Sequence, residues 1–152
     1  DGNFYTLSFT VGHVDTGRCI MIGGLQGPRS SEENNAKIKK LTRKLYGQRP
    51  KSLMVSLPTL IAQVWEVSTI LAVKTQSHTY AARRYSKGRI KTDYDALWQE
   101  LGGIEYNRHF YALKVNDTRR DTEGMSRSKR SMYRRRYEWL DNTKAEFATR
   151  LR

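Results

Sequence analysis

The sequence predicts a mixed α/β fold in which helices cover a β-sheet. Two β-favouring segments joined by turn residues open the chain, and helical and strand patterns then alternate. The short apolar segment 68–74 is typical of a strand in a sheet that is covered on both faces. With 152 residues, of which 38% are hydrophobic, we expect residues 1–152 to form one domain with its own core.

A β-hairpin is predicted at the start of the chain. Residues 3–11 alternate apolar and polar side chains and are rich in β-favouring types, and residues 18–24 form a second segment of this kind. Residues 12–17, with the sequence GHVDTG, supply the turn chemistry between them.

Two helices are expected next. Ser30 followed by Glu33 forms a capping box, apolar residues then recur at helical spacing, and Gly47 ends the helix. Pro50 can open the second helix, because proline suits the first helical turn. This helix is apolar almost all round and should be buried, while Pro58 within it predicts a kink or a break.

The second half of the chain predicts a helix, a strand and a long helix. Thr92 is a suitable N-cap for a short helix that Gly102 and Gly103 end. Residues 108–115 are the final strand candidate, and a long basic helix should start near Ser126.

The net charge of +13 favours an anionic partner, which could be nucleic acid, an acidic membrane surface or a phosphorylated small molecule. A generally basic soluble protein is the alternative. A recognisable nucleic-acid reader motif is absent, so nucleic acid is the less favoured partner. No apolar run is long enough to span a bilayer.

The single cysteine, Cys19, excludes an intrachain disulfide and a cysteine metal cluster, and it fits a reducing, cytoplasmic compartment. The three histidines are far apart in the sequence, so no metal site is expected.

The chain begins without Met inside an alternating pattern, and we expect it to be the C-terminal part of a longer chain.

The glycine-rich stretch IMIGGLQGPR allows two interpretations. Gly23, Gly24 and Gly27 let the backbone approach a ligand closely, and the amides of the following helix start favour an anion. Arg29 could pair with a phosphate. The stretch has neither a Walker A sequence nor G-x-G-x-x-G spacing, so a tight structural turn is equally compatible with it.

Polar residues follow the buried strand, at the position where ligands gather in open α/β sheets. They are Thr75, Gln76, Ser77, His78 and Tyr80. A histidine there could act as a general base and a tyrosine as an acid, although a packed polar loop is the alternative. No nucleophile stands at diagnostic spacing from His78, so a Ser-His-Asp triad is not predicted.

The predicted C-terminal helix interleaves arginines with aromatic residues. Arg134, Arg135 and Arg136 are consecutive, and Tyr133 and Tyr137 flank them. This pattern can bind nucleic acid or an anionic membrane. It is equally compatible with long arginine stems that cover the core while their charged ends reach water.

Several segments together resemble the VirK/YbjX family of bacterial proteins. They are IMIGGLQGPR, KLYGQRPKSL, ILAVKTQSHTYAARRY, TDYDALWQELGG and RSKRSMYRRRYEWLD. The resemblance covers nearly the whole chain and corresponds to the C-terminal part of that family, and Pro58 is a departure within the second helix. It implies an association with virulence and with envelope traits, including resistance to antimicrobial peptides, without a defined biochemical activity.

The C-terminal part of that family is in turn similar to the GNAT superfamily of acyl-CoA N-acyltransferases. This similarity implies a mixed, mainly antiparallel sheet flanked by helices, acyl-CoA or acetyl-CoA as cofactor, and an unidentified acceptor. The pyrophosphate loop, which departs from the usual Q/R-x-x-G-x-G/A pattern, would consist of Gly23, Gly24, Leu25, Gln26, Gly27, Arg29, Ser30 and Ser31. His78 is then the expected base and Tyr85 the expected acid.

The alternative is a degenerate acyltransferase-like fold without catalysis. Such a basic module would bind an anionic membrane lipid or a protein partner through Arg134, Arg135 and Arg136. It would place the protein in the cytoplasm, at the periphery of the inner membrane.

Overall fold

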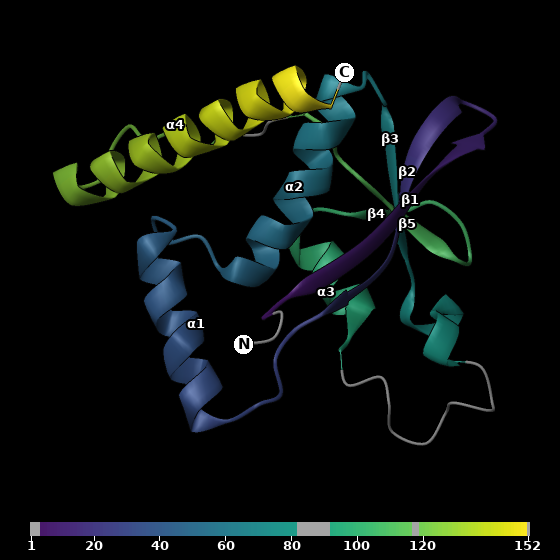
Figure 1. Ribbon diagram of the computed structural model, residues 1–152, viewed down its shortest axis with the longest axis horizontal. Helices are drawn as coiled ribbons and strands as arrows, with labels where there is room; N and C mark the ends of the chain where they lie inside the picture. Colours follow the sequence, from purple (N-terminus) through teal and green to yellow (C-terminus); the bar gives the residue numbers. More distant parts are fainter. Residues whose placement is uncertain (1–3, 82–91, 117–118, 152) are drawn as a thin grey trace.

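The computed structural model describes residues 4–81, 92–116 and 119–151 (Figure 1). Their elements are, in order, β1 Thr6–Val14, β2 Gly17–Gln26, α1 Glu32–Lys44, α2 Pro50–Val64, β3 Thr69–Val73, the 3₁₀ turns η1 Thr75–Ser77 and η2 Thr79–Ala81, α3 Tyr94–Glu100, β4 Ile104–Glu105, β5 Phe110–Leu113 and α4 Arg127–Arg150. The predicted order of strands and helices is confirmed. The two-residue strand β4 is an addition, too short for a sequence pattern to show.

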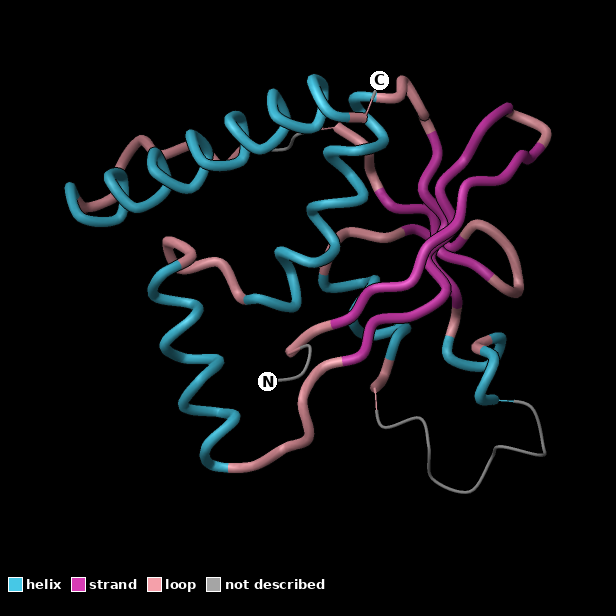
Figure 2. Tube along the Cα trace, in the orientation of Figure 1, coloured by secondary structure: helices cyan, strands magenta, loops and turns pink. Residues whose placement is uncertain are grey.

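The five strands form one open sheet (Figure 2). Their order in the sheet is β1-β2-β3-β5-β4. All neighbours are antiparallel except β2 and β3, which are parallel. The mixed, mainly antiparallel sheet and the opening hairpin are therefore confirmed. Residues 70–73 of β3 are all buried, as expected for a short, continuous apolar strand.

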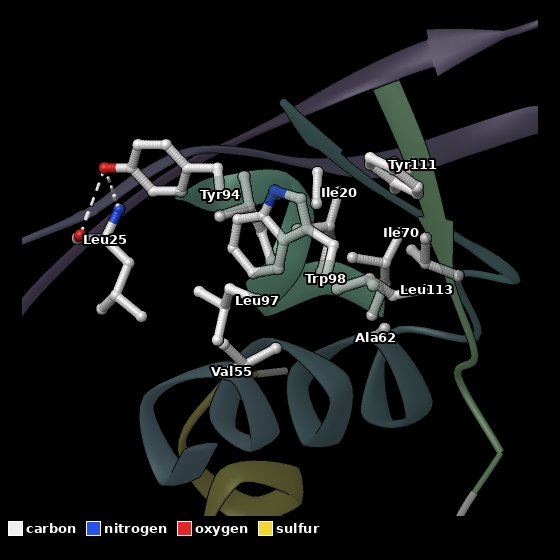
Figure 3. Packing of buried hydrophobic residues seen from close by; sticks show 13 residues of the cluster. Ile20, Leu25, Val55, Ala62, Ile70, Tyr94, Leu97, Trp98, Tyr111 and Leu113 are labelled. Atoms are coloured by element: carbon white, nitrogen blue, oxygen red, sulfur yellow. Dashed lines mark hydrogen bonds between the residues drawn. The ribbon is translucent and has the colours of Figure 1, made fainter. Parts of the chain in front are cut away.

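The four α-helices lie on one side of the strands (Figure 1). Figure 3 shows Trp98 and Leu97 of α3 between the sheet and α2, where they meet Val55 and Ile20. Trp98 is fully buried, and its indole Nε1 donates to the carbonyl of Val73, 2.8 Å away. Trp98 therefore packs beneath the end of β3 and also bonds to it, which ties α3 to the sheet.

Two predicted caps are wrong by one residue. The N-cap of α1 is Ser31, whose side chain accepts from the amide of Asn34, so the Ser30–Glu33 capping box is corrected. The N-cap of α3 is Asp93 rather than Thr92. In both cases two adjacent residues have capping side chains, and the tertiary position of the helix decides between them.

Pro58 does not break α2, which continues from Pro50 to Val64. Proline removes one helical hydrogen bond, but the side chain of Pro58 is fully buried and adds to the core. Pro50 occupies the first helical position as predicted. Within the described residues, no helix is long and apolar enough to cross a membrane.

Candidate active site

The candidate site lies where the parallel strands β2 and β3 part. Their pairing runs from Cys19 to Ile22 on β2 and from Thr69 to Ala72 on β3. β2 then continues beside β1 as far as Gln26, and the register between these two strands shifts by one residue at Gly23. Such a bulge bends a strand locally. Beyond Ile22, β2 is therefore paired with the antiparallel strand β1 but no longer with the parallel strand β3.

The hydroxyl of Tyr94 serves as the hydrogen-bonding partner of β2 beyond that point. It accepts from the amide of Leu25 at 3.2 Å and donates to the carbonyl of the same residue at 3.1 Å. Figure 3 shows both bonds. Leu25 is only 2% exposed, so without this hydroxyl its two backbone groups would be buried without a partner on that side.

His78 packs against both Tyr94 and β2. Its ring is stacked on that of Tyr94, with 4.9 Å between centroids and 14° between planes. A Cβ added to Gly24 would lie 2.9 Å from His78 Nε2, so a larger residue there would displace this ring. Burial lowers the pKa of His78 below the ordinary value, because it disfavours the charged imidazolium. At neutral pH His78 is therefore an uncharged imidazole that can accept a proton.

The turn η1 is fastened to the start of α3 by reciprocal hydrogen bonds. The Thr75 hydroxyl accepts from the amides of Tyr94 and Asp95, at 3.1 and 3.3 Å. In return the amide of Thr75 donates to the Asp95 carboxylate at 3.1 Å. These bonds fix the segment that carries His78 against the helix that carries Tyr94.

Ser77 and His109 form a second polar pair nearby. Ser77 Oγ lies 2.9 Å from His109 Nδ1, and Arg108 Nε donates to His109 Nε2 at 2.7 Å. Because Nε2 accepts, a neutral His109 carries its hydrogen on Nδ1 and donates it to Ser77. In this arrangement His109 does not act as a base toward the serine.

The predicted glycine loop is shorter than expected. Gly23, Gly24, Leu25 and Gln26 belong to β2, so the expectation that they form a loop is corrected. Pairing with β1 extends the strand through both glycines. The connection to α1 begins at Gly27, which packs against the ring of Tyr5.

Arg29 and Ser30 are exposed in that connection, and the carbonyl of Arg29 accepts from the side-chain amide of Asn34 at 2.7 Å. The structure thus brings Gly24 and Leu25 together with His78, whereas Tyr85 lies outside the described residues. Acyl-CoA binding by this region stays a prediction.

The three consecutive arginines of α4 have different surroundings. Arg136 donates from Nε and a terminal nitrogen to the carbonyl of Tyr46, at 3.1 and 2.7 Å, and its guanidinium lies 4.5 Å from the ring centroid of Tyr133. Arg134 and Arg135 are exposed. Arg136 therefore anchors α4 to the end of α1, while the other two present their charge to solvent.

Neither a metal site nor a reactive thiol is found in the described part of the chain. No group of three or more His, Cys, Asp or Glu residues there could hold a metal ion. Cys19 is fully buried, and burial raises the pKa of its thiol, which disfavours the reactive thiolate.

Sequence reasoning missed Tyr94, which links α3 to β2 across 69 positions of the chain. No local pattern signals such a contact, because Tyr94 also fits the apolar side of a short helix. The one usable signal was glycine at position 24, which indicates close approach of another group without saying which.

Comparison with known proteins places the chain among bacterial relatives. The family described as "Protein of unknown function (DUF535)" matches residues 1–149. The chain is 34% identical to the "Uncharacterized protein YbjX" of Escherichia coli K12, over 96% of this chain and 44% of that protein. An "Uncharacterized protein" of Haemophilus influenzae is 33% identical, over 80% of this chain and 40% of that protein.

The chain thus spans less than half the length of these curated relatives. No solved structure matches it. The resemblance to YbjX is confirmed, and the similarity to the GNAT superfamily stays a prediction.

Proposed function

The chain belongs to the DUF535 family, and from this premise we propose that it is an acyltransferase-like module that binds acyl-CoA where β2 and β3 part. One observation carries the proposal. The backbone of β2 leaves its parallel neighbour and is bonded instead to a side chain, with the uncharged His78 beside it.

A strand edge of this kind suits a ligand that carries amide groups. Main-chain amides and carbonyls can bind an extended amide chain as an added strand would, and the pantetheine arm of CoA has two such amides. The arm would take over the bonds that Leu25 now makes with Tyr94. The diphosphate would then lie over the connection from Gly27 to Ser31, where Arg29 is exposed and supplies a cation.

The chemistry requires positioning and one base. An amine or hydroxyl of the acceptor attacks the thioester carbonyl, His78 takes the proton of the attacking group, and the CoA thiolate leaves and is protonated. A histidine whose pKa is lowered by burial is ready for this role at neutral pH. Tyr85 remains the proposed acid.

Thermal unfolding with and without acetyl-CoA or a long-chain acyl-CoA tests the proposal. Ligand that binds only the folded chain raises Tm, by mass action. We expect Arg29→Glu to reduce the shift. Arg18→Glu makes the same charge change on an exposed arginine at the hairpin end and should leave the shift intact. Absence of a shift with CoA and with every acyl donor would refute acyl-CoA binding.

A second candidate function is a non-catalytic module that binds an anionic membrane or partner. The exposed, adjacent Arg134 and Arg135 of α4 favour it. This function predicts salt-sensitive binding to vesicles of an anionic phospholipid, weakened by Arg134→Glu with Arg135→Glu. Vesicle binding that is indifferent to salt and to both substitutions would exclude it.

A further inference from the structure

A groove of about 590 Å³ runs along the first half of α4. Within the part of the chain that the structure describes, its lining residues are Arg119, Arg120, Thr122, Arg127, Arg130, Ser131, Arg134 and Tyr137. The helical members recur at spacings of three and four residues and so share one face of the helix. The other wall is the segment that precedes α4. We refer to this feature as the arginine groove.

The far wall of the arginine groove is held in place by three contacts. The amide of Arg120 donates to the hydroxyl of Tyr137 at 2.9 Å. Arg119 forms an ion pair with Asp141, and its guanidinium lies 5.0 Å from the centroid of the Tyr137 ring. The preceding segment is thus fastened to the helix, and the shape of the groove follows from these bonds.

The arginine groove concentrates positive charge. Five of its eight lining residues are arginines, and none of the eight is a carboxylate. Asp141, which pairs with Arg119, lies outside the lining. The carboxylate of Asp121, in the same segment, accepts the amide of Glu123 at 2.9 Å. Like charges that line one groove repel one another, and an anion in the groove would relieve that repulsion.

From this arrangement we propose that the arginine groove binds a compact ligand with two adjacent phosphate groups, that is, a diphosphate ester. Guanidinium groups bind phosphate oxygens in pairs of parallel hydrogen bonds, which is why arginine is preferred at such sites. Arg119 is paired with Asp141, and the other four arginines of the lining still exceed the charge of a single phosphate. The volume falls within the usual range of small-molecule sites, about 300–1,000 Å³.

The groove suits a small diphosphate better than a nucleic-acid strand. Non-specific binding of a single strand combines a cationic track with exposed aromatic rings on which bases stack. The one aromatic residue of the lining, Tyr137, has its ring beneath Arg119 and its hydroxyl bonded to Arg120. The groove therefore offers guanidinium groups without a stacking platform.

The arginine groove and the candidate active site are separate. Figure 1 shows the first half of α4 extending away from the sheet, while residues 75–81 lie at the opposite side of the molecule. A diphosphate bound along α4 is therefore not the diphosphate of a CoA bound beside β2. The proposal stands independently of acyltransferase activity.

Calorimetric titration with inorganic pyrophosphate and inorganic phosphate, at matched ionic strength, tests the proposal. Pyrophosphate should bind at least about 10-fold tighter than phosphate. Arg130→Gln with Arg134→Gln should weaken it about 100-fold, since each arginine supplies a charge-assisted bond of about 1.5 kcal/mol or more. Lys129→Gln with Arg135→Gln removes the same charge from exposed residues outside the lining and should change affinity less than about 3-fold.

Two results would overturn the proposal. One is equal loss of affinity in the two double variants, which would mean that net charge alone attracts the anion. The other is pyrophosphate binding no tighter than phosphate. Titration with ADP and with phosphatidylcholine vesicles that contain a diphosphate lipid distinguishes a soluble ester from a lipid headgroup. The Arg29→Glu variant should retain pyrophosphate binding, which separates this test from that of acyl-CoA.

Discussion

At the end of β2 the buried backbone of Leu25 is bonded to one hydroxyl, whereas five arginines from α4 and the segment before it line an open groove. The first region buries the backbone of Leu25 and the side chain of Tyr94 and bonds them to each other. The second gathers exposed arginines, of which Arg119 is paired with Asp141. Hydrogen bonds are costly to lose when buried, while exposed charges contribute little to folding.

This difference indicates that the first region stabilises the fold, whereas the second is suited to binding. The contacts between Tyr94, His78 and β2 are part of the folded structure, so substitutions there should be measured first as losses of stability. The arginines that α4 contributes to the arginine groove, unlike Arg136, are exposed, so their substitution should appear in binding and in salt dependence. The predictions below test this division, beginning with the largest expected effect.

Trp98→Ala should destabilise the fold by about 3–5 kcal/mol. The residue is fully buried between α2 and the sheet, and its indole bonds to the end of β3. Urea unfolding followed by circular dichroism measures the change. As a control, Tyr106→Ala removes an aromatic residue that is 43% exposed and should cost less than about 1 kcal/mol. Similar costs at the two positions would contradict the core described here.

Tyr94→Phe should cost about 1–3 kcal/mol, because the amide and carbonyl of Leu25 would stay buried without their hydroxyl partner. The same substitution at Tyr111 is a matched control. The hydroxyl of Tyr111 receives one bond, from the side-chain amide of Gln99, in a partly buried position. The free energy of unfolding should therefore fall less for Tyr111→Phe than for Tyr94→Phe, and the reverse order would be inconsistent with a structural role of the Tyr94 hydroxyl.

The burial of His78 should make stability depend on pH in the acidic range. Its pKa is lowered in the folded state, so the folded chain binds fewer protons than the unfolded chain. Stability is then unaffected above the unfolded value of about 6.5 and falls as the pH drops below it. His78→Gln should reduce this loss. Ring signals followed by NMR would place the pKa directly, and a value at or above 6.5 would contradict the burial argument.

Regular elements were predictable from the sequence because their signals are local. The hairpin, the fully buried β3 and the start of α4 at Ser126 followed from periodicity, turn residues and a capping serine. The strand β2 was predicted to end too early, since glycines usually weaken strands, whereas pairing with β1 carries it on to Gln26.

The candidate sites depend on contacts between distant segments, which short-range patterns do not carry. The bond from Tyr94 to Leu25 spans 69 positions. Of the helical part of the arginine groove, the sequence pattern singled out only Arg134, as one of three consecutive arginines. Only the packing of residues 119–122 against Tyr137 makes this face of the helix a groove.

The smallest effect is expected for Arg130→Gln with Arg134→Gln in the absence of ligand. Removing two of five clustered cations relieves repulsion, so stability at low salt should rise by a few tenths of a kcal/mol, up to about 0.5. The gain should disappear at about 0.5 M sodium chloride, where the charges are screened. Urea unfolding at the two salt concentrations measures it.

Arg136→Gln makes one of these changes two residues further along the same helix and should have the opposite sign. Its guanidinium donates twice to the carbonyl of Tyr46 and covers the ring of Tyr133, so its loss should cost about 1–2 kcal/mol. This cost should persist at high salt because it comes from packing and hydrogen bonds. If the groove variant also lost stability at both salt concentrations, its arginines would be holding the fold, and the contrast between the two regions would fail.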